Sequence, residues 1–252
     1  MTLARVYLLT LWFYAGVHTL LSAAFIGADL WTLLQLPGEG PPLLRALLPW
    51  LIGGSEIAVA VLAAVPRTRR LGVAGAVLVH GGILLTLVHA RWNPSVWPWN
   101  VLCAAAAILL FVPWTRSLAA EWRAATPQLR VGALVLALYP LGFYAGVVDS
   151  HLAHALYAAN APEGYVCNLT GGPQTMRPGL GRERTYNHRD GDFECRDIFF
   201  NDVLGAPLPP IDRLFAAYFI RTCAAQEFLL TNERRPGVPD DLRQQVLYCP
   251  TP

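Results

Sequence analysis

Lysine is absent from the 252-residue chain, and charged residues of every kind are scarce. Charged side chains make up 14% of the residues, against about 25% in a typical soluble domain. Apolar residues make up 54%, and the mean hydropathy is +0.39. This composition excludes an ordinary soluble domain, and it excludes intrinsic disorder, which requires few apolar and many charged residues. The net charge of +2 gives no indication of nucleic-acid binding.

Several catalytic and redox motifs are also missing. The sequence contains no C-x-x-C pair, no G-x-x-x-x-G-K-[ST] phosphate loop, no G-x-S-x-G elbow, no H-E-x-x-H and no G-x-G-x-x-G. It therefore does not predict a thioredoxin-like redox pair, a zinc ribbon or a nucleotide-binding loop. His151 and His154 share one face of a predicted helix, but no further ligands stand at a recognisable spacing, so no metal site is predicted.

The few charges are unevenly distributed along the chain. Residues 1–149 contain 9 arginines and 5 acidic residues, whereas residues 150–252 contain 10 arginines and 12 acidic residues. A helix needs about 20 apolar residues, with a lower limit of about 17, to cross the hydrocarbon core of a bilayer. The first part contains five such runs, and none alternates with period 2 as barrel strands do. The predicted spans are residues 6–26, 47–65, 71–89, 98–114 and 131–148.

This pattern predicts an all-α membrane domain over residues 1–149 and a small exported tail over residues 150–252. An alternative for the first run is a signal peptide, with small residues at positions 24–28 resembling a cleavage site. The run is longer than the usual 7–15 apolar residues of a signal peptide, and we therefore favour a retained helix.

The arginines predict the orientation. Seven of them fall on one side of the predicted membrane, at Arg5, Arg67, Arg69, Arg70, Arg116, Arg123 and Arg130, and only Arg45 and Arg91 fall on the other. Positive residues concentrate on the cytoplasmic side of membrane proteins, so the N-terminus is predicted to be cytoplasmic. Five spans then place the tail outside, as expected for a multi-pass protein of a bacterial inner membrane.

Four of the five cysteines lie in the tail, at Cys167, Cys195, Cys223 and Cys249. In an exported domain they predict two disulfides, with three pairings left open. We expect a short helix over residues 150–160 and loops over 161–210, with a short strand or helix at 198–204. A second helix is predicted over residues 211–230. So small and loop-rich a tail has a thin core, which disulfides would stabilise.

Three ionisable residues stand inside the predicted spans, and such residues are costly in a bilayer and usually functional. His18, Glu56 and His80 reach similar depths, so together they can bind a polar head group such as that of a quinone. The structural alternative is that Glu56 pairs with one histidine to fix helix packing. A second candidate group lies at the outer boundary, where amphipathic residues form either a ligand entrance or an interfacial anchor: His89, Arg91, Trp92, Trp97, Trp99 and Asn100.

The membrane part resembles the DoxX/MauE-like superfamily of small four-helix membrane proteins. The resemblance is carried by Gly16-Val17-His18, Gly53-Gly54-Ser55-Glu56, Pro66-Arg67, His80 and Trp97-Pro98-Trp99-Asn100, and in the tail by Asp149-Ser150-His151-Leu152 and Leu208-Pro209-Pro210. The resemblance implies a four-helix bundle, to which this chain adds a fifth helix and the tail. Members of the superfamily take part in thiosulfate:quinone oxidoreduction, methylamine dehydrogenase maturation and membrane redox homeostasis.

The sequence thus supports two functional hypotheses. The first is a redox-associated membrane protein that binds a quinone or another lipophilic ligand in its bundle and works with a periplasmic or membrane redox partner. The second is a non-catalytic assembly or maturation factor whose exported tail docks a periplasmic protein.

Overall fold

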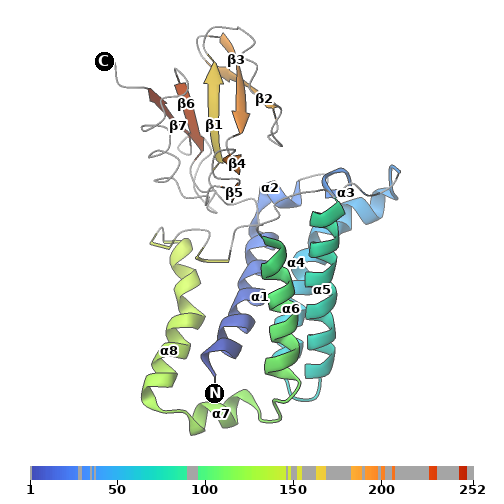
Figure 1. Cartoon of the computed structure of the whole chain (residues 1–252), viewed down its shortest axis with the longest axis vertical. Coiled ribbons are helices and arrows are strands. Elements are labelled where there is room, and N and C mark those ends of the chain that lie inside the picture. The colour runs from blue at the N-terminus through green and yellow to red at the C-terminus, as the bar shows by residue number, and fades with distance from the viewer. Residues whose placement is uncertain are drawn as a thin grey trace. The chain divides into compact units, whose positions relative to one another are not determined.

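The computed structural model (Figure 1) divides the chain into two compact units, Met1–Val148 with Leu152–Ala159, and Asp149–His151 with Asn160–Pro252. Within the first unit it describes residues 2–27, 30–34, 36, 38–89, 96–145, 147–148 and 152–154; within the second it describes seven short strands. Only the backbone is described at residues 23–24 and 32–33 and in the strands.

In the first unit, all the regular elements of the described part are helices. Its five longer helices are α1 (Leu3–Leu21), α4 (Pro42–Ala64), α5 (Arg69–His89), α6 (Trp97–Phe111) and α8 (Pro127–Leu138). The shorter elements are α2 (Ala23–Ile26), α3 (Leu30–Leu33), α7 (Leu118–Ala124) and the 3₁₀ helix η2 (Tyr139–Phe143). Two helices, α4 and α5, are long and apolar enough to cross a membrane, whereas α6 and the segment Pro127–Phe143 are apolar but shorter.

Each of the five predicted spans falls on one of the longer helices, but several boundaries were wrong. α1 ends at Leu21 rather than at residue 26, because Ser22 takes an extended conformation and its hydroxyl accepts a hydrogen bond from the Phe25 backbone N–H. A serine that bonds the backbone in this way starts a new helix rather than continuing the old one. α4 begins earlier than predicted, at Pro42, since proline is well suited to the first turn of a helix.

The fifth predicted span is not one continuous helix. α8 begins at Pro127, where the Thr126 side chain accepts a hydrogen bond from the Leu129 N–H, and it ends at Leu138. Pro140 cannot donate the next backbone hydrogen bond, and the chain continues as the 3₁₀ helix η2.

The predicted helix over residues 150–160 is absent at residues 152–154, which form a turn with His154 at φ 64°. The carbonyls of Leu152 and Ala153 accept hydrogen bonds from the side chains of Tyr139 and His18, so they serve as acceptors for tertiary contacts. The other positions of this predicted helix lie outside the described residues.

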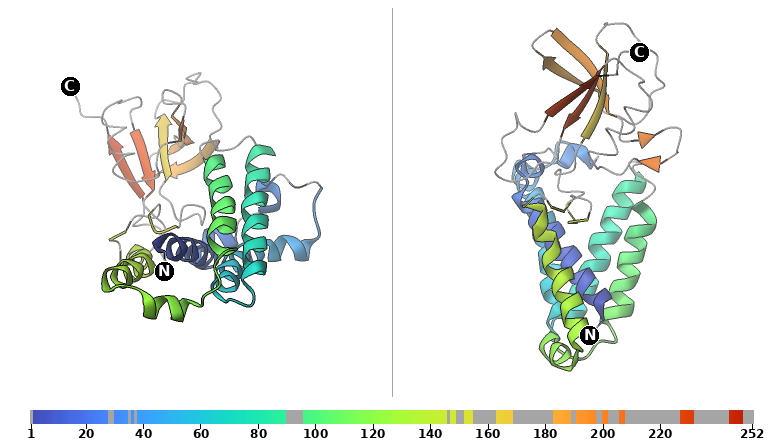
Figure 2. Two further views of the ribbon diagram at one scale, coloured as in Figure 1. Left: turned by 60° about the horizontal axis from the view of Figure 1, so that its bottom comes forward. Right: turned by 90° about the vertical axis from the view of Figure 1, so that its left-hand side faces the viewer.

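Packing brings α1 against α4 and α8, and α5 against α4 and α6 (Figures 1 and 2). Helices approach closely where side chains are small. A Cβ added to Gly16 would lie 2.4 Å from the Gly53 carbonyl oxygen, and one added to Gly72 would lie 2.3 Å from the Ala63 backbone nitrogen. Close backbone approach at small residues is a common way for membrane helices to associate.

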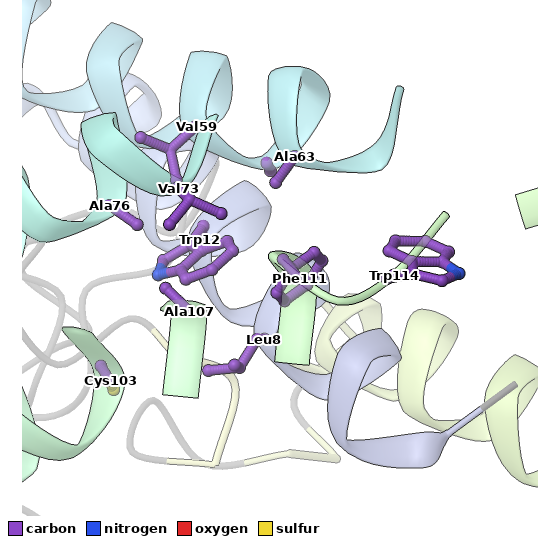
Figure 3. Packing of buried hydrophobic residues seen from close by; sticks show 11 residues of the cluster. Leu8, Trp12, Val59, Ala63, Val73, Ala76, Cys103, Ala107, Phe111 and Trp114 are labelled. Atoms are coloured by element: carbon purple, nitrogen blue, oxygen red, sulfur yellow. The ribbon is translucent and has the colours of Figure 1, made fainter. Parts of the chain in front are cut away.

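The core of the bundle surrounds Trp12, which is only 2% exposed. Figure 3 shows Trp12 between Val59 of α4, Val73 and Ala76 of α5 and the Ala107 region of α6. The same cluster continues through Phe111 to Trp114. Four helices therefore share one core.

The tail contains a five-stranded antiparallel sheet with the strand order β2-β3-β1-β6-β7. Its strands are β1 (Glu163–Asn168), β2 (Glu183–His188), β3 (Gly191–Asp197), β6 (Glu227–Thr231) and β7 (Gln244–Tyr248). A separate pair is formed by β4 (Phe200–Asn201) and β5 (Ala206–Pro207). β4 lies within the region for which a short strand or helix was expected.

We expected loops over most of residues 161–210 and a helix over 211–230, and both expectations were wrong where the structure describes the chain. β1, β2 and β3 occupy parts of the predicted loop region, and residues 227–230 belong to β6. β6 pairs with β1 and β7, both distant in sequence, and such long-range pairing is not visible in local periodicity. The remaining positions of the predicted helix lie outside the described residues.

Candidate functional site

Both histidines of the predicted intramembrane group are buried, His18 with 0% and His80 with 7% of its surface exposed. They lie in two separate hydrogen-bond networks.

The first network passes through His80. The Trp12 Nε1–H donates to His80 Nε2 over 2.9 Å, and His80 Nδ1 lies 3.0 Å from Asn100 Oδ1. The Trp12 indole can only donate, so Nε2 is the acceptor and the ring proton sits on Nδ1, from which it is donated to Asn100. Asn100 Nδ2 in turn donates to the Val96 carbonyl over 3.0 Å. Three helices, α1, α5 and α6, are thus joined by a neutral imidazole with both nitrogens occupied.

The second network passes through His18. Its Nε2 lies 2.9 Å from the Ala153 carbonyl oxygen and must donate to it, and its Nδ1 lies 2.9 Å from the Tyr144 hydroxyl. Tyr14, Phe143 and Tyr144 surround the ring with centroid distances of 5.2 to 5.9 Å. His18 therefore ties α1 to the chain that follows α8.

Glu56 joins neither network. It lies on the stripe of α4 that continues through the buried residues Val59, Ala60 and Ala63. Among the described residues its buried Oε2 atom has no hydrogen-bond partner. The structure thus buries both histidines and a carboxylate oxygen of Glu56, but within its described part it does not join the three residues by hydrogen bonds.

The predicted outer group divides among different environments. Asn100 is buried in the His80 network. Trp99, next to it at the start of α6, is 38% exposed, and His89 is exposed at the end of α5. Trp97 begins α6 and is half-buried. Arg91 and Trp92 lie outside the described residues.

An apolar groove lies between α1, α6 and α8 and was not predicted. Its volume is about 420 Å³, within the usual range of about 300–1,000 Å³ for small-molecule sites. The groove is lined by Leu3, Ala4, Tyr7, Leu8, Trp99, Leu102, Cys103, Ala106, Leu110 and Leu136. Only Tyr7, Trp99 and Cys103 among these carry a side-chain hydrogen-bond donor.

Tyr7 also belongs to an aromatic cluster beside this groove. Its ring meets His154 edge-on, with 5.3 Å between centroids, and His154 Nε2 lies 3.3 Å from the Tyr139 hydroxyl. Sequence reasoning missed Tyr7 and Trp12. Both are polar-tipped aromatic residues within an apolar run, and such residues usually need a hydrogen-bond partner when buried.

A third polar cluster is formed around Trp114, after the end of α6. The Arg69 guanidinium lies 3.7 Å and that of Arg5 lies 5.0 Å from the centre of the Trp114 ring. Arg69 donates to four carbonyls, those of Ala63, Ala64, Trp114 and Arg116. Arg5 donates to the Leu110 carbonyl over 2.8 Å and pairs with Glu121 over 3.2 Å. These contacts hold the ends of α1, α5, α6 and α7 together, which is a structural role.

The tail cysteines are placed only in part. Cys167 lies on β1 and Cys195 on β3, whereas Cys223 and Cys249 lie outside the described residues. Cys103 is a free, buried thiol on the groove wall. Within the described residues, no group of three or more histidine, cysteine or acidic side chains is placed to hold a metal ion.

No family model, no curated protein and no protein of known structure matches this chain.

Proposed function

We propose that this protein is a multi-pass membrane protein of the DoxX type that binds an isoprenoid quinone in the groove between α1, α6 and α8. The main observation behind the proposal is the groove itself. A groove lined almost entirely by apolar side chains suits a long hydrocarbon tail. The resemblance to the DoxX/MauE-like superfamily in α1 and α4 supports a quinone as the class of ligand. The two helices of membrane length support the membrane location.

The hydrogen bonds of the buried histidines favour the groove over the bundle centre as the ligand site. His80 uses both ring nitrogens for Trp12 and Asn100, and His18 uses both for Ala153 and Tyr144. A ligand there would have to replace bonds that are already made in a buried site, which is costly. In the groove, by contrast, the lining is almost wholly apolar, so a hydrocarbon ligand would displace no hydrogen bond there.

We place the protein in a bacterial inner membrane, with five crossing helices, a cytoplasmic N-terminus and the tail outside. Three arginine-bearing segments, the start of α1, the start of α5 and the chain after α6, meet in the Trp114 cluster and so lie at one end of the bundle. This agrees with the arginine pattern on which the orientation is based. A periplasmic or membrane redox partner would exchange electrons with the bound quinone.

The experiment is to purify the protein in mild detergent, extract it with solvent and quantify isoprenoid quinone per chain by mass spectrometry. Ala106→Trp fills the groove and is expected to lower quinone content at least tenfold. Ile108→Trp is the matched control, since Ile108 is on the same helix but outside the groove and 46% exposed, and it should retain the wild-type content. Equal quinone content in wild type and Ala106→Trp would refute the groove as the site.

The alternative, an assembly factor acting through its tail, is favoured by one observation: the tail forms a compact unit with its own five-stranded sheet. This function requires the tail but not the groove. Ala106→Trp should then leave biological activity intact in a complementation assay, while reduction of the tail disulfides should abolish it.

A further inference from the structure

The tail sheet brings two cysteines to one register position. β1 and β3 are antiparallel neighbours, and Cys167 is paired directly with Cys195. Residues directly opposite on antiparallel strands have Cα atoms about 4.5 or 5.5 Å apart. Disulfides join residues whose Cα atoms lie about 4.4–6.8 Å apart. The register therefore places these two positions within the range of Cα separations that a disulfide can join.

The other neighbours of these positions are not cysteines. On its second side Cys167 is paired with Glu227 of β6, and Cys195 is paired with Arg184 of β2. Cys167 and Cys195 are therefore each other's only cysteine neighbours in the register of the sheet.

We propose that Cys167 and Cys195 form a cross-strand disulfide, which leaves Cys223 and Cys249 to form the second. The second pair follows by elimination, and in the sequence its two cysteines flank strands that are paired with each other. Tyr248, the last residue of β7, is paired with Glu227, the first residue of β6. In the sequence, Cys249 directly follows Tyr248, and Cys223 precedes Glu227 by four positions.

Each disulfide forms by exchange with an oxidised thiol–disulfide oxidoreductase of the exported compartment. A tail thiolate attacks the disulfide of that protein, the second tail thiolate displaces it from the mixed disulfide, and the oxidoreductase is left with two thiols. Two electrons and two protons leave the tail for every disulfide formed. This inference rests on the export of the tail, which is part of the proposed function.

The test is peptide mapping of the full-length protein purified from membranes. Free thiols are alkylated under denaturing conditions, and the chain is digested with trypsin without reduction. An arginine separates each consecutive pair of tail cysteines, at Arg182, Arg196 and Arg234, so the four fall on four different peptides. We expect one linked pair joining the Cys167 and Cys195 peptides and another joining the Cys223 and Cys249 peptides, both lost on reduction.

Two variants sharpen the result. Cys195→Ser should make Cys167 fully alkylated while the Cys223–Cys249 link persists. Cys103→Ser is the control and should leave both links unchanged, because Cys103 lies in the helical unit.

A link between Cys167 and either Cys223 or Cys249 would overturn the pairing alone. Four alkylated tail thiols in the wild type would overturn both the disulfides and the export of the tail. Correct links without bound quinone would instead contradict only the ligand proposed for the groove.

Discussion

His80 links three helices through two hydrogen bonds, and these require a neutral imidazole ring because one nitrogen accepts while the other donates. Its Nε2 accepts from Trp12, and its Nδ1–H donates to Asn100. In an apolar bundle each of these bonds counts, because a buried polar group without a partner keeps its full desolvation cost. At the residue scale, the histidine is therefore a structural link between α1, α5 and α6.

This role makes a prediction for Asn100→Leu. The substitution leaves the His80 Nδ1–H buried without its acceptor, so we expect the free energy of unfolding to fall by about 1–3 kcal/mol. The measurement is equilibrium unfolding in mixed micelles with a denaturing detergent. Thr86→Val is the control, since the exposed Thr86 hydroxyl bonds only to Gly82 within its own helix, and its effect should stay below about 0.5 kcal/mol. Equal stability of the two variants would contradict the assigned role.

Glu56 differs from Glu121 in that it forms no ion pair within the described residues. Glu56→Gln preserves the shape of the side chain and breaks no described contact, so we expect a change in unfolding free energy below about 0.5 kcal/mol. Glu121→Gln removes the charge that attracts the Arg5 guanidinium over 3.2 Å in this partly buried pair, and we expect a loss of about 1–3 kcal/mol, since hydrogen bonds to charged groups contribute more than neutral ones. The same unfolding assay serves both. A large loss in Glu56→Gln would reveal a charged or proton-sharing partner for Glu56.

At the scale of elements, the helices are held together by close approaches at glycine. Gly72→Ala places a methyl group 2.3 Å from the Ala63 backbone nitrogen, so α4 and α5 must separate. We expect a loss of about 1–3 kcal/mol from this overpacking. Gly81→Ala lies on the same helix, where an added Cβ meets nothing within 4 Å, and it should stabilise the protein by about 0.5–1 kcal/mol through helix propensity. Thermal unfolding of the two variants in detergent measures the difference, and a destabilised Gly81→Ala or a neutral Gly72→Ala would contradict this packing.

The helices could be predicted from the sequence because continuous apolar runs are a local signal. Their ends could not, because they depend on single residues such as Ser22, Pro42 and Pro140 that favour a new start or a change of helix type. The turn at residues 152–154 was missed for another reason. Its carbonyls are bound by His18 and Tyr139, and no local pattern reveals such distant partners.

For the candidate site, the sequence could single out unusual residues but could not predict their contacts. A charge-poor span makes His18, Glu56 and His80 conspicuous, and the structure buries the two histidines, while their role in binding a ligand stays a prediction. Their partners depend on how each helix is rotated about its axis, which periodicity alone does not fix when a helix is apolar all round. The groove was missed because its walls are ordinary leucines and alanines from three helices.

At the scale of the whole molecule, the chain combines a helical unit with a separate unit containing the five-stranded sheet. In its described part, the helical unit contains two helices of membrane length, a shared core around Trp12 and the apolar groove. The proposed function assigns the ligand to the first unit, and the disulfides that we infer lie in the second. Each assignment can fail without the other.

The most direct test of the central proposal is photolabelling of the reconstituted protein with an azido-quinone, followed by tryptic mapping. Arginines place α6 on the peptide 92–116 and α1 on 6–45, whereas His80 lies on 71–91 and Glu56 on 46–67. We predict that the label appears on 92–116 or 6–45, within groove residues such as Tyr7, Cys103 and Ala106, and that it is lost in Ala106→Trp and retained in Ile108→Trp. Label on 71–91 or 46–67 that survives in Ala106→Trp would contradict the groove and place the ligand at the His80 and Glu56 positions.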